Sequence, residues 1–153
     1  MGFFDKIKSA VNAVTGNAAK VTLEFQPSGT LMPGDQVTVK VTATSTGQQV
    51  KSKGCFIDLT AIESINIKPK QADVPSDINV TKTAFEQAFQ IAPEFVLAPN
   101  ENKVFEGTFT VPPGVQPSFT GTFANFEWQM RGRIEAVGND PDSGFKPVRV
   151  GCR

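Results

Sequence analysis

An alternation of apolar and polar side chains with a period of two residues constrains the fold of this chain more than any other feature. Because successive side chains of a β-strand point to opposite faces of a sheet, such alternation predicts strands with one buried face and one solvated face. One segment is ambiguous, since Phe85 and Phe89 also have helical spacing. The best-defined of the predicted strands cover residues 21–25, 37–44, 55–61, 85–91, 105–111, 124–135 and 145–150.

Proline and glycine mark the turns between these segments. In the pair Pro33-Gly34, the proline presets φ and the glycine supplies a positive φ, which predicts a type II turn. The run Pro112-Pro113-Gly114 ends the strand that precedes it. Eight or nine strands with such turns predict an all-β, immunoglobulin-like antiparallel β-sandwich. Residues 64–83 have the least regular pattern and are expected to contain a long connection.

The first sixteen residues follow a different period. Apolar side chains recur there at spacings of three and four, which predicts a short amphipathic α-helix over residues 1–16, followed by one domain over residues 19–153. The apolar face of this helix could pack against protein, within one chain or between chains, or lie on an anionic membrane. Packing is favoured because only two lysines stand against one aspartate in this segment. The helix face comprises Phe3, Phe4, Ile7, Val11 and Val14.

Composition argues against several function classes. The 153 residues carry 15 Lys and Arg against 15 Asp and Glu, so the chain lacks the cationic field of a typical nucleic-acid-binding protein. It has no histidine, the commonest general base and metal ligand, and no phosphate-binding loop or dinucleotide fingerprint. The sequence therefore predicts a protein without enzymatic activity, cofactor or metal. Its 13 phenylalanines are expected to carry the core.

The sequence also indicates a compartment. It shows no signal-peptide pattern and no apolar run of the roughly 20 residues needed to span a bilayer, so a cytoplasmic location is expected. In a reducing cytosol the two cysteines, Cys55 and Cys152, are expected to be thiols. The alternative is one disulfide that ties the last strand to a central one.

Two arginines are candidates for binding an anion or a peptide carboxylate. Arg131 and Arg133 lie on the solvated face of the strand predicted over residues 124–135. Glu127 and Glu135 share that face, so an arrangement in which the charges pair with one another is favoured. The segment 139–144 is rich in Asn, Asp and Gly, as expected of a tight loop between strands.

Six segments of the sequence together carry a family resemblance: Phe3-Phe4 with the helix after it, Ala19–Val21, Leu31–Val37, Phe95–Glu101, Phe105–Phe119 and Trp128–Glu135. They resemble the bacterial, arrestin-like sporulation-control protein family. The resemblance implies a single arrestin-type β-sandwich lobe in a scaffold or adaptor without catalytic activity. Members of that family usually carry two such lobes in tandem, whereas this sequence covers one, which leaves a surface that a second copy could cover.

The sequence therefore predicts a non-catalytic scaffold or adaptor module that acts by protein–protein interaction, with self-assembly into a homo-oligomer as one form of it. Binding is expected along an exposed strand edge or through the N-terminal helix. The identity of the protein partner stays open at this point. The alternative function is that of a peripheral membrane protein anchored by the helix face.

Overall fold

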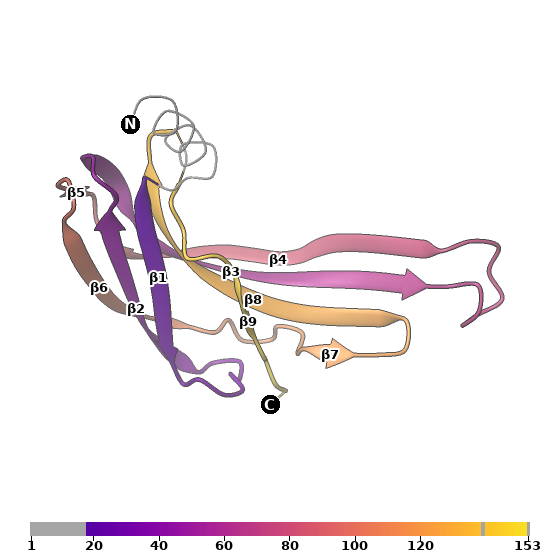
Figure 1. The fold of residues 1–153 in the computed structure, drawn as a ribbon. Helices are drawn as coiled ribbons and strands as arrows, with labels where there is room; N and C mark the ends of the chain where they lie inside the picture. The colour runs from indigo at the N-terminus through magenta and orange to yellow at the C-terminus, as the bar shows by residue number, and fades with distance from the viewer. Residues whose placement is uncertain (1–17, 139, 153) are drawn as a thin grey trace, which may run out of the picture.

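The computed structural model describes residues 18–138 and 140–152. Within them the chain forms nine β-strands (Figure 1). The helix predicted over residues 1–16, with Phe3, Phe4, Ile7, Val11 and Val14, lies outside the described residues. The strands are β1 (Ala19–Gln26), β2 (Gln36–Ser45), β3 (Val50–Ile67), β4 (Ile78–Ala92), β5 (Phe95–Leu97), β6 (Asn102–Thr110), β7 (Phe119–Thr120), β8 (Ala124–Ala136) and β9 (Lys146–Val148).

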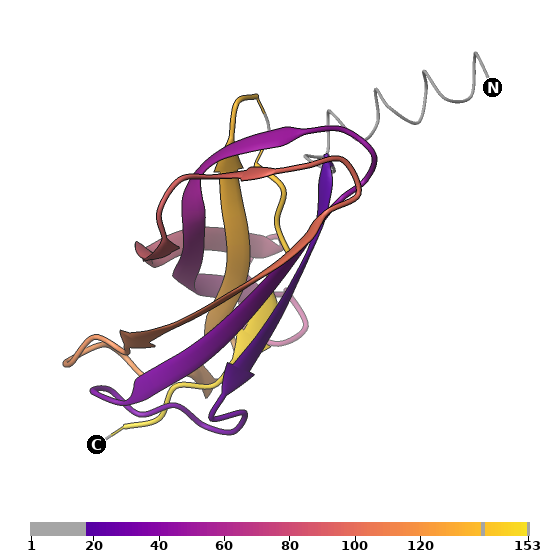
Figure 2. The ribbon, with the colours of Figure 1, turned by 90° about the vertical axis from the view of Figure 1, so that its left-hand side faces the viewer.

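The strands form two sheets that face each other (Figure 2). The smaller sheet has the order β1-β2-β6. The larger sheet has the order β4-β3-β8-β7, with β5 paired to β3 and β9 paired to β8. Each of these strand pairs is antiparallel. The predicted all-β, antiparallel architecture is therefore confirmed.

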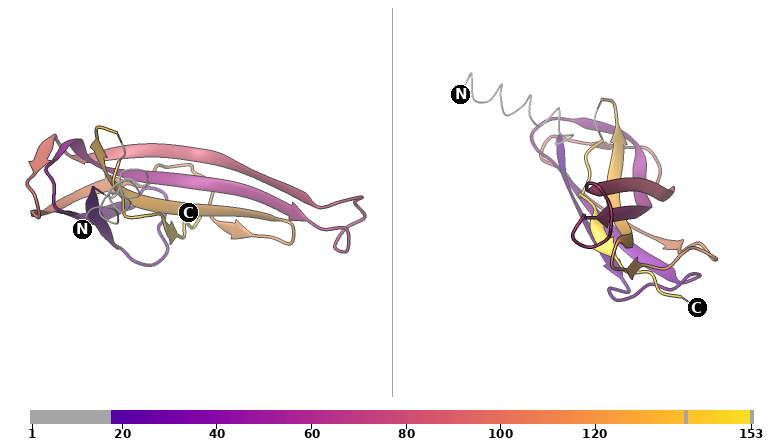
Figure 3. Two further views of the ribbon diagram at one scale, coloured as in Figure 1. Left: turned by 45° about the horizontal axis from the view of Figure 1, so that its top comes forward. Right: turned by 90° about the vertical axis from the view of Figure 1, so that its right-hand side faces the viewer.

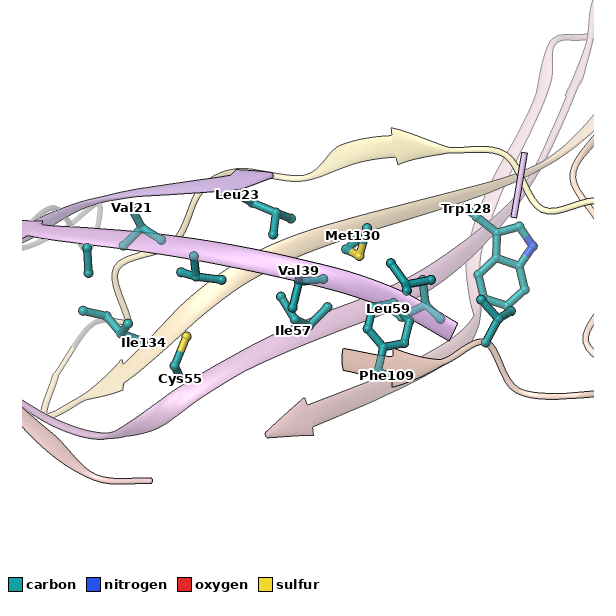
Figure 4. Close-up of a cluster of buried hydrophobic side chains, with 14 of the residues drawn as sticks. Val21, Leu23, Val39, Cys55, Ile57, Leu59, Phe109, Trp128, Met130 and Ile134 are labelled. Atoms are coloured by element: carbon teal, nitrogen blue, oxygen red, sulfur yellow. The ribbon is translucent and has the colours of Figure 1, made fainter. Parts of the chain in front are cut away.

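The core lies between the two sheets and is built from their inward-facing residues (Figure 4). In β2, Val37, Val39 and Val41 are fully buried, while Thr38 and Lys40 between them are exposed. This is the alternation that the sequence predicted. Burying each such valine contributes about 1.5–3 kcal/mol, so the inward face of one strand stabilises the sandwich substantially.

The prediction that phenylalanine carries the core is wrong. Among the described core residues only Phe109 and Phe126 are buried phenylalanines, and most of the others are aliphatic. Other rings lie at the margin of the core: Phe89 of β4 stacks on Phe109 of β6 with ring centroids 4.7 Å apart, and Phe95 of β5 contacts Phe105 of β6 at 4.5 Å. These rings join the edges of the two sheets, where a large side chain fills space that a valine would leave open.

The hairpin of β3 and β4 is longer than the sequence suggested. β3 continues to Ile67 and β4 begins at Ile78, so the connection expected within residues 64–83 is present as residues 68–77, and both flanking strands extend into the expected range. A β-bulge interrupts the pairing between Ala61 and Ile62, where β4 contributes one extra residue. The bulge shifts the apolar positions of β4 by one residue, so the period-two alternation of this strand is interrupted and does not predict its full length.

The long strands make the large sheet extend beyond the small one. The left view of Figure 3 shows β3, β4 and β8 projecting past the three-stranded sheet. We call the projecting part, residues 62–83 with residues 119–127, the arm. Its position decides which surfaces of the molecule are left for a partner.

The turn predicted at Pro33-Gly34 is confirmed. Gly34 has a φ of 90°, and the backbone N–H of Asp35 donates to the carbonyl of Met32 at 2.9 Å. A non-glycine residue at this φ would be strained, so the glycine is required here. The turn places the start of β2 beside the end of β6.

Candidate functional site

A cluster of charged side chains lies on the outer face of the large sheet. Asp58 of β3 accepts hydrogen bonds from Nε of Arg131 and Nε of Arg133, both at 2.8 Å, and from Nη2 of Arg133 at 3.1 Å. Asp58 is nearly buried, with 11% of its side chain exposed, while 31% of Arg131 and 15% of Arg133 is exposed. One carboxylate therefore holds two guanidinium groups that project from neighbouring positions on β8.

Two further carboxylates fasten the loop after β8 to this cluster. Asp140 accepts from Nη1 of Arg133 at 3.1 Å and from the backbone N–H of Ala136 at 3.0 Å. Asp142 accepts from Nη1 of Arg131 at 3.4 Å and from the backbone N–H of Gly144 at 2.7 Å. The loop that joins β8 to β9 is thus held against the sheet by charge-assisted hydrogen bonds.

The arginines are also placed against aromatic rings. The guanidinium of Arg133 lies 4.8 Å from the ring centroid of Phe56, and that of Arg131 lies 4.7 Å from that of Phe145. Partial burial disfavours the charge on Arg133, but hydrogen bonds and attraction from Asp58 and Asp140 outweigh it and raise the pKa of this guanidinium. Arg133 therefore stays charged at any physiological pH.

The structure assigns these arginines partners other than those expected from the sequence. Reasoning along one strand pointed to Glu127 and Glu135, whereas the partners shown are Asp58 of β3 and two aspartates of the following loop. Asp58 lies 73 and 75 residues before the arginines, so only the pairing of β3 with β8 brings them together. The available signal was a lone carboxylate within the apolar run of β3.

A depression of about 470 Å³ lies beside this charged cluster. Its lining includes Asp58, Arg131 and Arg133 together with Thr60 and Gln129. An anion entering it would compete with carboxylates that already hold the guanidinium groups, so binding through these arginines stays a prediction. The geometry itself shows a clamp that holds the loop and β8 together.

The inner face of the arm is apolar and exposed. In the register of the sheet, Ile65 lies opposite Val80, and Ile67 lies opposite Ile78. Val80 is 53% exposed and Ile78 is 37% exposed, and Phe119 of β7 is 39% exposed on the same face. This face continues the one that carries the buried core, but the small sheet ends before reaching it (Figure 1).

The two cysteines differ in their surroundings. Cys55 is buried among core residues, Cys152 is exposed, and these two residues are not joined in a disulfide. Burial raises the pKa of the Cys55 thiol to about 12, against the weaker opposing effect of the positive charge on Arg133. Cys55 is therefore an apolar core residue and a poor nucleophile at neutral pH.

With this geometry in view, comparison with known proteins identifies the fold. No protein-family model and no curated protein matches the chain. Among solved structures, the sporulation control protein Spo0M of Bacillus subtilis matches with a TM-score of 0.62 over 90% of this chain, at 20% sequence identity. The chain has the fold of Spo0M. The predicted resemblance to arrestin-like sporulation-control proteins is confirmed at the level of the fold.

The chain spans about half the length of Spo0M, since the match covers 51% of that protein. A weaker match, with a TM-score of 0.50 and 11% identity, joins 94% of this chain to 33% of the alkylpurine DNA glycosylase AlkC of Pseudomonas fluorescens, solved bound to DNA containing an abasic site analog. At these identities both matches concern the fold alone. In the part of the chain that the structure describes, no helix is long and apolar enough to cross a membrane.

Proposed function

We propose that this protein is a non-catalytic, arrestin-like adaptor of the cytoplasm that binds a protein partner through the inner face of the arm. The observation that carries this proposal is the exposure of Val80, Ile78 and Phe119 on a face that elsewhere forms the core. An apolar patch that continues a core face is a typical protein-interaction surface.

The sequence of the arm supports the same function. The segments Ile65-Asn66-Ile67 and Ile78-Asn79-Val80 alternate as strands with one buried face do. Within the described residues nothing covers this face sufficiently to bury Val80. An apolar strand face that is not buried by the described chain is expected of a strand pair that binds another protein.

The edge of β4 restricts how a partner binds. Within the described part of the large sheet β4 is an edge strand, and edge strands add further strands readily. Near its middle, however, β4 carries the bulge beside Ala61 and the inward-facing Lys82 opposite Glu63. Bulges and inward charges are the features by which edge strands resist extension, so the apolar face is the preferred contact.

The remaining chemistry of the molecule is consistent with a role without catalysis. The chain has no histidine, and the pKa of the buried Cys55 thiol is raised to about 12. The outer-face carboxylates Asp58, Asp140 and Asp142 accept hydrogen bonds from arginines, which engages them in holding the loop against the sheet.

The test is site-specific photocrosslinking in the cell that makes this protein. A photoreactive phenylalanine analogue replaces Val80, and the matched control replaces Val104, which is 49% exposed on β6 outside the arm. The proposal expects one dominant protein adduct, identified by mass spectrometry, from position 80 and not from position 104. Adding Ile78→Asp should abolish that adduct. Equal adducts from both positions would exclude the arm as the binding surface.

A further inference from the structure

We infer that the partner at this surface is a second copy of the chain, whose N-terminal segment, residues 1–16, binds the inner face of the arm. The inference rests on the proposed function and names the occupant of the same surface. Two apolar surfaces of this chain then cover each other: the arm face, and the helix face that the sequence predicts.

The N-terminal segment of the same copy cannot reach this face as a helix. Ala18 lies beside Gln49 and Val50, at the start of β3. Ile65 is 15 residues further along β3, about 50 Å away at about 3.3 Å per residue. The helix predicted over residues 1–16 would be about 24 Å long, so even when directed along β3 it would end about 25 Å short. An occupant of this kind must therefore come from another molecule.

The dimensions of the two surfaces agree. The six residues from Ile78 to Thr83 make the arm about 20 Å long, and it narrows from four strands beside Phe126 to the β3–β4 pair at Ile67. The apolar face of the predicted helix, from Phe3 to Val14, would be about 17 Å long at 1.5 Å per residue, so it matches the length of the arm.

The chemistry of the two surfaces agrees as well. The predicted helix face consists of two phenylalanines, one isoleucine and two valines, which match the isoleucines and Val80 of the arm. Beside its apolar residues the arm face carries Glu63 and Lys82, and the segment carries Asp5, Lys6 and Lys8. Both surfaces therefore carry charges of both signs, so opposite charges can meet in one orientation of the helix.

The arrangement predicts a closed dimer. The start of β3 and the arm lie at opposite ends of the large sheet (Figure 1). When two copies lie side by side in opposite directions, the N-terminal segment of each lies next to the arm of the other. Two identical contacts then form about a two-fold axis, and no surface is left over for growth into a filament.

The first experiment measures self-association of the full chain by sedimentation velocity over a range of concentrations. Val80→Asp on the arm and Phe4→Asp in the segment are each expected to raise the dimer dissociation constant by at least about tenfold, because each places a charge in an apolar contact. Since both act on one contact, the double variant should be weakened by clearly less than the product of the two effects. Val104→Asp, a matched change outside the arm, should leave the dissociation constant unchanged.

The second experiment uses a fluorescent peptide of residues 1–18. Its anisotropy should rise on addition of the full chain and should not rise with the Val80→Asp variant, whose melting temperature is measured to verify folding. A chain that stays monomeric at all concentrations would overturn the inference, and so would independent, multiplicative effects of the two substitutions.

A third outcome also overturns it: the peptide binds vesicles of phosphatidylglycerol but not the full chain, which makes the segment a membrane anchor. The proposed function is judged separately. If position 80 crosslinks to a different protein while the chain is monomeric, the adaptor function stands and only the second copy is excluded.

Discussion

Replacing Asp58 with alanine tests whether the outer-face cluster is a clamp or a set of solvated surface pairs. Asp58 accepts three hydrogen bonds from Arg131 and Arg133, and 11% of its side chain is exposed. Removing one partner of a buried ion pair typically costs about 3–5 kcal/mol, because the opposite charge stays behind uncompensated. Since both arginines are partly exposed, we expect a loss near the lower end, about 3 kcal/mol.

The assay is urea unfolding followed by tryptophan fluorescence. With a slope of about 2 kcal/mol per molar urea, a loss of about 3 kcal/mol lowers the midpoint by about 1.5 M. The control is Glu24→Ala on β1, where the carboxylate lies opposite Lys40 on an exposed surface. That substitution should cost less than about 1 kcal/mol, because exposed cross-strand pairs contribute little.

A second variant distinguishes the loss of attraction between Asp58 and the arginines from the cost of leaving the charge of Arg133 uncompensated. In the Asp58→Ala background, Arg133→Met removes the positive charge but keeps most of the apolar side chain, and it should recover part of the lost stability. The reasoning is refuted if Asp58→Ala costs no more than Glu24→Ala. It is also refuted if Arg133→Met further destabilises the Asp58→Ala variant by its full effect in the wild type.

Two further predictions concern the core. Because the pKa of Cys55 is raised from 9.0 to about 12, the folded state keeps a proton that the unfolded state loses. Between pH 9 and about 12 the unfolding free energy of the wild type should therefore fall with pH more steeply than that of Cys55→Ala, by up to about 1.4 kcal/mol per pH unit. Urea titrations at several pH values measure both unfolding free energies. If the two proteins lose unfolding free energy equally with pH, the prediction is contradicted. Gly107→Ala should cost about 1–3 kcal/mol, since its methyl group would lie 2.9 Å from Cβ of Ile91, and Ile91→Ala in the same chain should relieve part of that cost in thermal unfolding.

The strands that the sequence predicted well are those whose apolar face packs against another part of the described chain. In β2 and β8, one face packs on the opposite sheet and the other meets water, so apolar and polar residues alternate without a break. The turn at Gly34 was equally predictable, because a positive φ restricts the choice of residue. Local chemistry was sufficient in these places.

The elements that the sequence predicted poorly depend on contacts between distant segments. The clamp needs Asp58 beside Arg131 and Arg133, and this neighbourhood exists only once β3 pairs with β8. The extension of β3 and β4 was missed because the bulge after Ala61 shifts the apolar positions of β4 by one residue. The alternation of apolar and polar residues along one strand does not show which charged residue of another strand lies beside it. The alternation also breaks at a bulge, which shifts it by one residue.

The extension of β3 and β4, which the sequence did not reveal, connects the fold to the proposed function. On each side of the bulge the alternation is intact, but the apolar positions that Ile78 and Val80 occupy are exposed. A sequence pattern records which face is buried in the working state of a protein, including burial by another molecule. An exposed face whose sequence alternates as a buried face does therefore indicates that a binding partner is missing from the single copy. This difference, more than the size of the patch, is the physical reason to look for the partner at the arm.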